Sequence, residues 1–277
     1  MRIRVNDELI LNYELAGDPS RQAVVVLTHG MGGSHASWEA DVPELSSKYA
    51  ILRWDVRGHG DSEKPDIPYD AAMHARDLAG LLEALDIGEV FCGGNSMGGA
   101  ITQRFMLDFP EKVRAGFLLC TSSEVGAKMG GAWEERARTA ETQGMEAMME
   151  AQASLANANV SVQPASAEAQ EAGREVTMKI PGKIYARIVR AMASYDWTAE
   201  LTRIRVPVLI LQGLQDTMTP PGGAVIIHRL IPQSQLVMMD QCSHAIQADQ
   251  PEQWRRHLLN FLDGVESWYG AGLLATR

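Results

Sequence analysis

The stretch VFCGGNSMGGA, residues 90–100, changes character within a few positions. It begins as an apolar run typical of a strand and ends in small residues that open a helix. Ser96 lies between the two parts, with Gly94 two positions before it and Gly98 two positions after it. In a very tight strand-to-helix turn, larger side chains at those two positions would clash, and the strained backbone would point the serine hydroxyl outward. We call residues 94–98 the serine turn and predict that Ser96 is a nucleophile.

A serine hydroxyl is a weak nucleophile unless a base takes its proton and a carboxylate orients that base. After a serine turn of this kind, the acid and then the histidine follow along the chain. Asp216 follows the apolar run 206–211. His244 follows the apolar run 235–239. Because the carboxyl ends of parallel strands share one crevice, we predict Ser96, Asp216 and His244 as the catalytic residues.

Other histidines and carboxylates compete for these roles. His29 and His59 lie among glycines before the serine, where we expect them to fix loops by hydrogen bonds. Glu124, after the apolar run 113–120, is the alternative acid, and Asp240 is a weaker third. The remaining histidines lie on or near expected helices and are predicted as surface or packing residues: His35, His74, His228 and His257.

The oxyanion that forms when a carbonyl is attacked needs preorganised N–H donors. Met97 follows the nucleophile at the start of a helix and can supply one backbone amide. The second donor is expected in the glycine-rich loop HGMGG, residues 29–33, which we call the oxyanion loop. Gly30 allows the chain to turn the next amide inward, so we predict Met31 and Met97 as the oxyanion hole. The alternative is a flexible glycine loop without a catalytic role.

Apolar runs of strand length alternate with segments of helical spacing along most of the chain. This alternation predicts an α/β fold, with a mainly parallel sheet flanked by helices on both faces. Segments 1–5 and 9–15 predict an antiparallel hairpin that turns at Asn6 and Asp7. The other expected strands are residues 23–28, 49–54, 89–94, 113–120, 206–211 and 235–239, and the expected helices are residues 71–85, 100–109 and 251–262. The tail from residue 265 onward could dock on the fold or fray.

Residues 122–198 interrupt the alternation, because they are rich in Ala, Met, Glu and Gln and contain no strand-like run. We predict a helical cap here, inserted into a core of residues 1–121 and 199–277. A disordered linker is the alternative for residues 157–171. Flexible apolar side chains of the cap could line a substrate pocket, although the same spacing is typical of ordinary helix core. The candidate lining residues are Trp133, Met145, Met148, Met149 and Trp197.

The composition sets further limits. The chain has 277 residues, of which 45% are hydrophobic, and a formal net charge of −10, which repels nucleic-acid phosphates and disfavours such a partner. Three widely spaced cysteines form no disulfide or metal pattern, and we expect Cys92 and Cys120 to be buried. No apolar signal region opens the sequence and no apolar run is long enough to span a bilayer. We therefore expect a cytoplasmic protein without a membrane partner.

Several motifs resemble those of the α/β-hydrolase fold family. They are His29-Gly30 with its glycines, the loop DVRGHGDS at residues 55–62, the serine turn, Asp216 and His244. Within that family the chain is most similar to the bacterial 3-oxoadipate enol-lactonase and small carboxylesterase branch. Two stretches carry this similarity, LRWDVRGHG at residues 52–60 and GLQDTMTPP at residues 213–221. The resemblance covers nearly the whole chain apart from the cap, and it implies an α/β-hydrolase fold.

The triad and the resemblance together predict a serine hydrolase that cleaves a small carboxylic ester or lactone through an acyl-enzyme, with no metal or organic cofactor. Ser96 disfavours haloalkane dehalogenases and epoxide hydrolases, which resemble the chain but use an aspartate at this position. Hydrolases of ring-cleavage products, which break carbon–carbon bonds, usually carry Trp after the histidine, where this chain has Ala245. They remain one alternative, and a slow-turnover ligand receptor is another. The sequence leaves open whether the protein forms a homo-oligomer.

Overall fold

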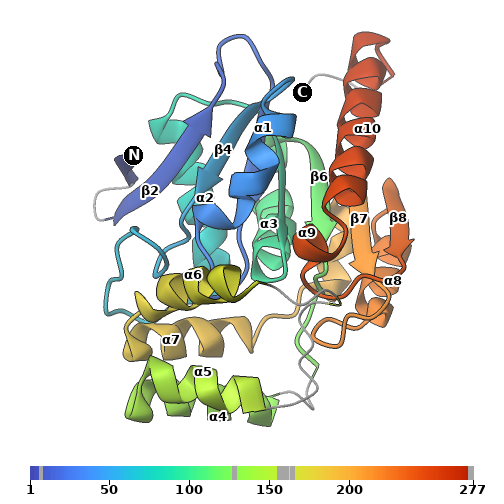
Figure 1. Ribbon diagram of the computed structural model, residues 1–277. Coiled ribbons are helices and arrows are strands. Elements are labelled where there is room, and N and C mark those ends of the chain that lie inside the picture. Colours follow the sequence, from blue (N-terminus) through green and yellow to red (C-terminus); the bar gives the residue numbers. More distant parts are fainter. Residues whose placement is uncertain (6–8, 127–129, 155–161, 163–165, 274–277) are drawn as a thin grey trace.

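The computed structural model describes residues 1–5, 9–126, 130–154, 162 and 166–273. Within these residues, eight strands form one sheet in the order β1-β2-β4-β3-β5-β6-β7-β8 (Figure 1). The strands are β1 (Arg2–Val5), β2 (Leu9–Ala16), β3 (Val24–Thr28), β4 (Ala50–Trp54), β5 (Val90–Asn95), β6 (Val113–Leu119), β7 (Val208–Gly213) and β8 (Ser234–Met239). Strands β3 to β8 are parallel. The antiparallel pairing of β1 with β2 confirms the predicted hairpin, whose turn at Asn6 and Asp7 lies outside the described residues.

Side chains of the central strands alternate between two buried layers, one on each face of the sheet. In β3, Val24 and Val26 belong to one apolar cluster, whereas Val25 and Leu27 belong to the other. A strand covered on both faces has no solvated side, so its sequence is a continuous apolar run. This burial explains why residues 23–28 predict a strand without any polar alternation.

Helices cover both faces of the sheet (Figure 1). The first cluster includes side chains of α2 (Ala71–Ala84), α3 (Met97–Asp108) and α8 (Pro221–Leu230). The second cluster includes side chains of α1 (Val42–Leu45), α9 (Ile246–Asp249) and α10 (Pro251–Gly270). The predicted α/β class, with a mainly parallel sheet flanked by helices, is therefore confirmed.

Residues 122–198, which we call the inserted segment, lie between β6 and β7 in the sequence. Four α-helices are found among the described residues of this segment. They are α4 (Gly130–Gln143), α5 (Met145–Ser154), α6 (Ala167–Met178) and α7 (Gly182–Met192). Figure 1 shows α6 and α7 nearer the sheet than α4 and α5. Helices α4 and α7 approach closely, since a Cβ on Gly182 would lie 2.0 Å from the carbonyl oxygen of Ala140. The division into core and cap domains stays a prediction, and part of the linker alternative, residues 157–161 and 163–165, lies outside the described residues.

Several element boundaries differ from the sequence-based expectation. Helix α3 begins at Met97 rather than at residue 100. Its first turn contains Gly98 and Gly99, whose low helix propensity argues against a helix, but close packing against neighbouring atoms requires glycine at both positions. Helix α10 continues to Gly270, where a helix ending at residue 262 was expected, because the buried Val265 extends its apolar face past Gly264.

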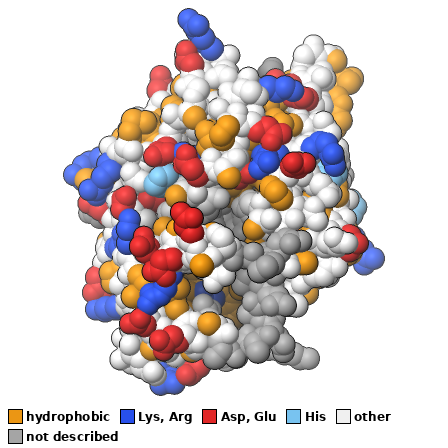
Figure 2. All heavy atoms as spheres, in the orientation of Figure 1, with side chains coloured by type: hydrophobic (Ala, Val, Ile, Leu, Met, Phe, Trp, Pro, Cys, Tyr) orange, Lys and Arg blue, Asp and Glu red, His pale blue; other side chains and the backbone are white. Residues whose placement is uncertain are grey.

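Many charged side chains on the surface form ion pairs. Acidic and basic side chains lie near one another on much of the face shown in Figure 2. Two ion pairs join α7 to the loop before α2, namely Lys183 with Asp66 at 2.7 Å and Arg187 with Asp66 at 2.6 Å. In the part of the chain that the structure describes, no helix is both long and apolar enough to cross a membrane. All three cysteines are buried, as expected for Cys92 and Cys120.

Candidate active site

The serine turn connects β5 directly to α3. Ser96 is the one residue between them, with φ 55° and ψ −117°, in a region that residues other than glycine rarely occupy. A Cβ on Gly94 would lie 2.4 Å from the carbonyl oxygen of Thr28, and a Cβ on Gly98 would lie 2.1 Å from the same oxygen. The two glycines therefore let β3 approach the turn closely, and Ser96 is held in a strained conformation at its tip.

Hydrogen bonds hold the backbone of Ser96 on both sides. Its N–H donates to the carbonyl of Leu119 at 2.9 Å, and the hydroxyl of Thr121 donates to its carbonyl at 2.8 Å. The next residue, Met97, begins α3, and the first N–H groups of a helix have no carbonyl partner within that helix. The turn thus presents a half-buried serine beside the positive end of a helix.

Asp216 and His244 meet at the carboxyl ends of β7 and β8. The Nδ1 atom of His244 lies 2.9 Å from Oδ2 of Asp216, and both side chains are buried. Thr219 binds the same carboxylate twice, through its N–H to Oδ1 at 2.9 Å and its hydroxyl to Oδ2 at 2.6 Å. Burial raises the pKa of Asp216, but the hydrogen bonds from His244 and Thr219 outweigh it and hold the pKa below its ordinary value of 3.8. A charged Asp216 therefore keeps a hydrogen on Nδ1 of His244, which leaves Nε2 free to act as a base.

The histidine loop, residues 240–245, lies against the serine turn. The Nδ2 atom of Asn95, the residue before Ser96, donates to the carbonyl of His244 at 3.3 Å. The structure therefore brings all three predicted catalytic residues to one edge of the sheet.

A second buried carboxylate supports the histidine loop from the other side. Oδ2 of Asp249 accepts hydrogen bonds from the N–H and the hydroxyl of Ser243, both at 2.8 Å. Its Oδ1 accepts the N–H of Val162, in the inserted segment, at 2.8 Å. The carbonyl of Ser243 accepts a hydrogen bond from the thiol of Cys120, whose Sγ lies 3.4 Å from the carbonyl oxygen. The backbone on the amino-terminal side of His244 thus has little freedom to move.

The oxyanion loop lies directly beside the serine turn. A Cβ on Gly30 would lie 3.6 Å from Cβ of Ser96. The carbonyl of Gly30 accepts the N–H of Gly33 at 3.1 Å and lies 2.7 Å from Nδ1 of His29. Because C=O and N–H point in opposite directions across a trans peptide, holding this carbonyl fixes the direction of the Met31 N–H.

The tautomer of His29 follows from its second contact. Its Nε2 accepts the N–H of Val56 at 3.0 Å, so the ring hydrogen is on Nδ1 and donates to Gly30. Burial lowers the pKa of His29, which keeps the ring neutral. His29 therefore fixes a loop, in agreement with the sequence-based expectation, and it does so at the peptide that carries the proposed oxyanion donor.

The candidate lining residues of the inserted segment fall into two groups. Met145, Met148 and Trp197 are 6%, 1% and 5% exposed and belong to the apolar core. Trp133 and Met149 are half-buried and pack against that core, so they retain surface with which to contact a ligand. Substrate lining stays a prediction, which the burial favours for Trp133 and Met149.

The competing carboxylates lie in exposed positions. Glu124 forms an isolated backbone bridge with Asp196, and its carbonyl accepts the hydroxyl of Ser122 at 2.8 Å. Asp240 accepts a hydrogen bond from Gln215 at 3.1 Å. His35 is not the simple surface or packing residue that was expected, since its Nδ1 lies 2.8 Å from the buried Asp55. That hydrogen bond raises the pKa of His35.

Sequence reasoning missed Asn95, Asp249 and Thr219 as residues that organise the site. Asn95 and Thr219 lie one and three positions from predicted catalytic residues, so proximity in sequence was an available signal. Asp249 is five positions from His244, but its role depends on hydrogen bonds to Ser243 and to Val162 of the inserted segment, which no sequence motif indicated. Among the described residues, no group of three or more His, Cys, Asp or Glu side chains is arranged to hold a metal ion.

Comparison with known proteins finds a matching family and similar sequences. The model of the α/β-hydrolase fold matches residues 23–251. A 3-oxoadipate enol-lactonase of Acinetobacter baylyi is 26% identical over 245 residues, which are 88% of this chain and 90% of that protein. A 2-hydroxy-6-oxo-2,4-heptadienoate hydrolase of Pseudomonas putida is 29% identical over 254 residues, with 89% and 90% covered.

The backbone fold is also similar to that of a solved structure. The enol-lactonase of Burkholderia xenovorans LB400 superposes with a TM-score of 0.85 at 25% identity, covering 95% of this chain and 100% of that one. The family match spans most of the chain, including the serine turn, Asp216 and His244. The chain belongs to the α/β-hydrolase fold family.

Proposed function

We propose that this protein is a serine hydrolase that cleaves a small carboxylic ester or lactone through an acyl-enzyme. One observation carries the proposal above the others. A strained serine at the tip of a strand-to-helix turn shares one sheet edge with a buried aspartate–histidine pair, whose Nδ1–Oδ2 distance is 2.9 Å. Serine, base and orienting acid are the parts that nucleophilic acyl transfer requires.

In the proposed mechanism, Nε2 of His244 takes the proton of the Ser96 hydroxyl as the serine oxygen bonds to the substrate carbonyl carbon. His244 then gives that proton to the leaving oxygen as the carbon–oxygen bond of the ester breaks. A water molecule, deprotonated by His244, attacks the acyl-enzyme. His244 returns that proton to the serine oxygen as the bond from this oxygen to the acyl carbon breaks, which releases the acid. Asp216 stays ionised and stabilises the imidazolium that forms in each half of the reaction.

The oxyanion of each tetrahedral intermediate is proposed to accept the N–H groups of Met31 and Met97. The first lies on a peptide whose carbonyl is fixed by His29, and the second opens α3. A donor that is already oriented costs no reorganisation during the reaction, and losing one typically lowers kcat by about 10²–10³.

The substrate class rests on the relatives and on the inserted segment. Two enol-lactonases are among the similar proteins, one by sequence and one by structure. The half-buried Trp133 and Met149 would give an apolar, adaptable wall for a small acyl group. The proposal needs no cofactor, because every proton transfer and charge is assigned to a side chain or amide of this chain.

The test is steady-state hydrolysis of a short-chain aryl ester and of a small lactone by wild type and two variants. Ser96→Ala should lower kcat by about 10⁵–10⁶ or to background. Ser47→Ala is the matched control, since Ser47 is an exposed serine whose hydroxyl only caps a local carbonyl, and it should leave turnover unchanged. Substantial ester turnover by Ser96→Ala would refute the mechanism.

A second candidate function is the carbon–carbon hydrolase. The 29% identity to a 2-hydroxy-6-oxo-2,4-heptadienoate hydrolase favours it, whereas Ala245 after the catalytic histidine disfavours it. Loss of colour from a conjugated dienol-keto acid, at a rate well above aryl ester hydrolysis by the same preparation, would select this function over the first.

A further inference from the structure

We propose that Thr177 of α6 is a positioning residue for the oxyanion hole, so that the inserted segment supplies part of the catalytic geometry. This inference rests on the proposed function. Oγ1 of Thr177 donates to the carbonyl of Gly32 at 3.0 Å, across 145 positions in the sequence. Gly32 directly follows Met31, whose N–H is the proposed oxyanion donor.

The contact between Thr177 and Gly32 is tight as well as polar. Gly32 has φ +81°, and a Cβ at this position would lie 3.3 Å from Oγ1 and 3.4 Å from Cγ2 of Thr177. The threonine side chain therefore packs against the α-carbon of the glycine while its hydroxyl binds the carbonyl. The carbonyl of Gly173 in the same helix also lies 3.0 Å from this hydroxyl, so the two carbonyls share its single hydrogen in a bifurcated hydrogen bond.

The oxyanion loop needs such an external contact because of its composition. Residues 30–33 form a four-residue turn that is closed by the N–H of Gly33 and the carbonyl of Gly30 at 3.1 Å. Positive φ at the third residue is typical of a type II turn. Three of the four residues are glycines, which have more conformational freedom than any other residue. Without a second anchor, the peptides around Gly32 and Gly33 could rotate and carry Met31 with them.

The two anchors of the turn come from different parts of the molecule. His29 holds the carbonyl of Gly30 from the core, and Thr177 holds the carbonyl of Gly32 from the inserted segment. Close to α6, the exposed ion pair of Lys179 with Asp61 at 3.8 Å also links the inserted segment to the core, and such pairs contribute little. Among the described residues, the Thr177 hydroxyl thus provides a hydrogen bond from the inserted segment to the backbone of the oxyanion loop.

The test compares Thr177→Val, which keeps the shape but loses the hydroxyl, with Thr177→Ser, which keeps the hydroxyl. Thr142→Val is the matched control, because Thr142 makes the same bond to the carbonyl four residues earlier, on the exposed side of α4. We expect Thr177→Val to lower kcat about tenfold with KM changed by less than about twofold, since misplacing a catalytic group acts on the transition state. Thr177→Ser and Thr142→Val should resemble wild type.

Inhibition by phenylboronic acid gives a readout that a merely structural role would not move. The serine oxygen bonds to boron as His244 takes its proton, and the product is a tetrahedral anion that resembles the intermediate stabilised by the oxyanion hole. The inhibition constant should weaken in Thr177→Val by about the same factor as kcat. Unchanged kcat and boronate affinity would overturn the proposal, and so would a rise in KM alone or an equal loss in Thr177→Ser.

Hydrogen exchange separates this inference from the proposed function. In substrate-free protein, the amide of Gly33, whose N–H closes the turn on the carbonyl of Gly30, should exchange faster in Thr177→Val than in wild type, while the amides of α3 should not change. If wild type lacks ester turnover, the proposed function fails and this comparison still decides whether Thr177 holds the loop. Equal exchange in the two proteins would overturn the inference. If Thr177→Val fails to fold, Thr177→Ala takes its place in both experiments.

Discussion

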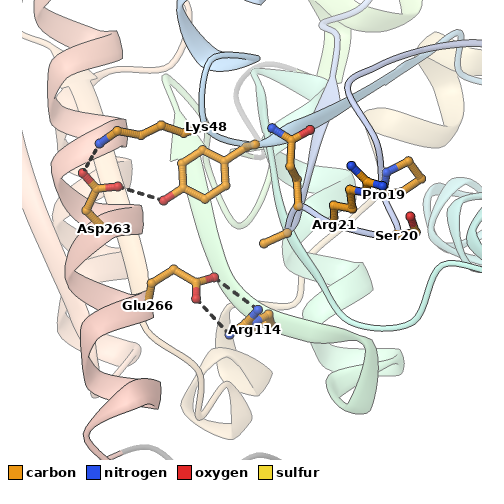
Figure 3. A pocket seen from close by; sticks show the side chains of 10 residues that line it. Pro19, Ser20, Arg21, Lys48, Arg114, Asp263 and Glu266 are labelled. Atoms are coloured by element: carbon orange, nitrogen blue, oxygen red, sulfur yellow. Dashed lines mark hydrogen bonds and ion pairs between the residues drawn. The ribbon is translucent and has the colours of Figure 1, made fainter.

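Charged residues at the two edges of the central sheet have opposite environments, buried at one edge and exposed to solvent at the other. At the carboxyl edge, the side chain of Asp216 is 0% exposed and receives hydrogen bonds from a histidine and from backbone amides. At the amino edge, a hollow of about 570 Å³ opens between the starts of β3, β4 and β6 and helix α10 (Figure 3). Its charges pair with each other, Lys48 with Asp263 at 2.6 Å and Arg114 with Glu266 at 3.1 Å.

The difference shows that a surface hollow alone does not identify an active site. The side chain of Asp263 is 45% exposed, so water screens its charge and its partner is replaceable. Asp216 has no access to water and must be stabilised by oriented donors, which also orient His244. A fixed, buried charge beside a strained serine is suited to catalysis, whereas a solvated ion pair contributes mainly to solubility.

The largest expected effect comes from removing the charge at the carboxyl edge. Asp216→Asn should lower kcat by about 10⁴, because the amide would favour the wrong tautomer of His244 and would not stabilise its cation. Aryl ester kinetics measure this effect, with Asp240→Asn, an exposed aspartate in the histidine loop, as the control. A loss of less than tenfold would assign the orienting role to another carboxylate.

The next effect concerns the second buried carboxylate at the same edge. Asp249→Asn should lower kcat/KM by about a hundredfold, since an amide has one acceptor atom where the structure directs donors to both oxygens. Ser243→Ala removes only the hydroxyl bond and should cost about tenfold or less. If Asp249→Asn kept full activity, rigid support of the histidine loop would not be needed.

Alanine substitutions of glycines at the two edges should also have different effects, in this case on the free energy of unfolding. A Cβ on Gly98 would lie 2.1 Å from the carbonyl oxygen of Thr28, so Gly98→Ala should lower the free energy of unfolding by about 2 kcal/mol or more. Gly88, before β5 at the amino edge, has open space where a methyl group would lie, with no atom within 4 Å, and its φ is not positive. Gly88→Ala should be neutral or stabilising by about 0.4–1 kcal/mol in urea denaturation. Equal losses would remove this contrast between the edges.

The smallest effect is expected at the amino edge. Asp263→Asn weakens contacts to Lys48 and Tyr49, both on the rim of the hollow. It should change the free energy of unfolding by no more than about 1 kcal/mol and leave ester turnover unchanged. A fall in kcat would show that the hollow of Figure 3 is coupled to the active site and would break the comparison.

The sequence predicted what depends on local pattern. The glycines around Ser96, the post-strand positions of Asp216 and His244, and the topology of a parallel sheet sufficed to predict that these residues meet at one edge. Contacts made across the fold could not be predicted in this way. Asn95 reaches His244 over 149 positions and Thr177 reaches Gly32 over 145, and neither pair has a local signature.

Covalent trapping tests the central claim, that Ser96 is the nucleophile, most directly. A fluorophosphonate should bond to the Ser96 oxygen with loss of fluoride, and peptide mass mapping should find the label on the peptide that contains residue 96. We predict labelling of Ser96 in wild type at a rate that Asp216→Asn strongly reduces, and no label on this peptide in Ser96→Ala. An enzyme that hydrolyses esters while Ser96 stays unlabelled, or that is labelled at another residue, would contradict the account.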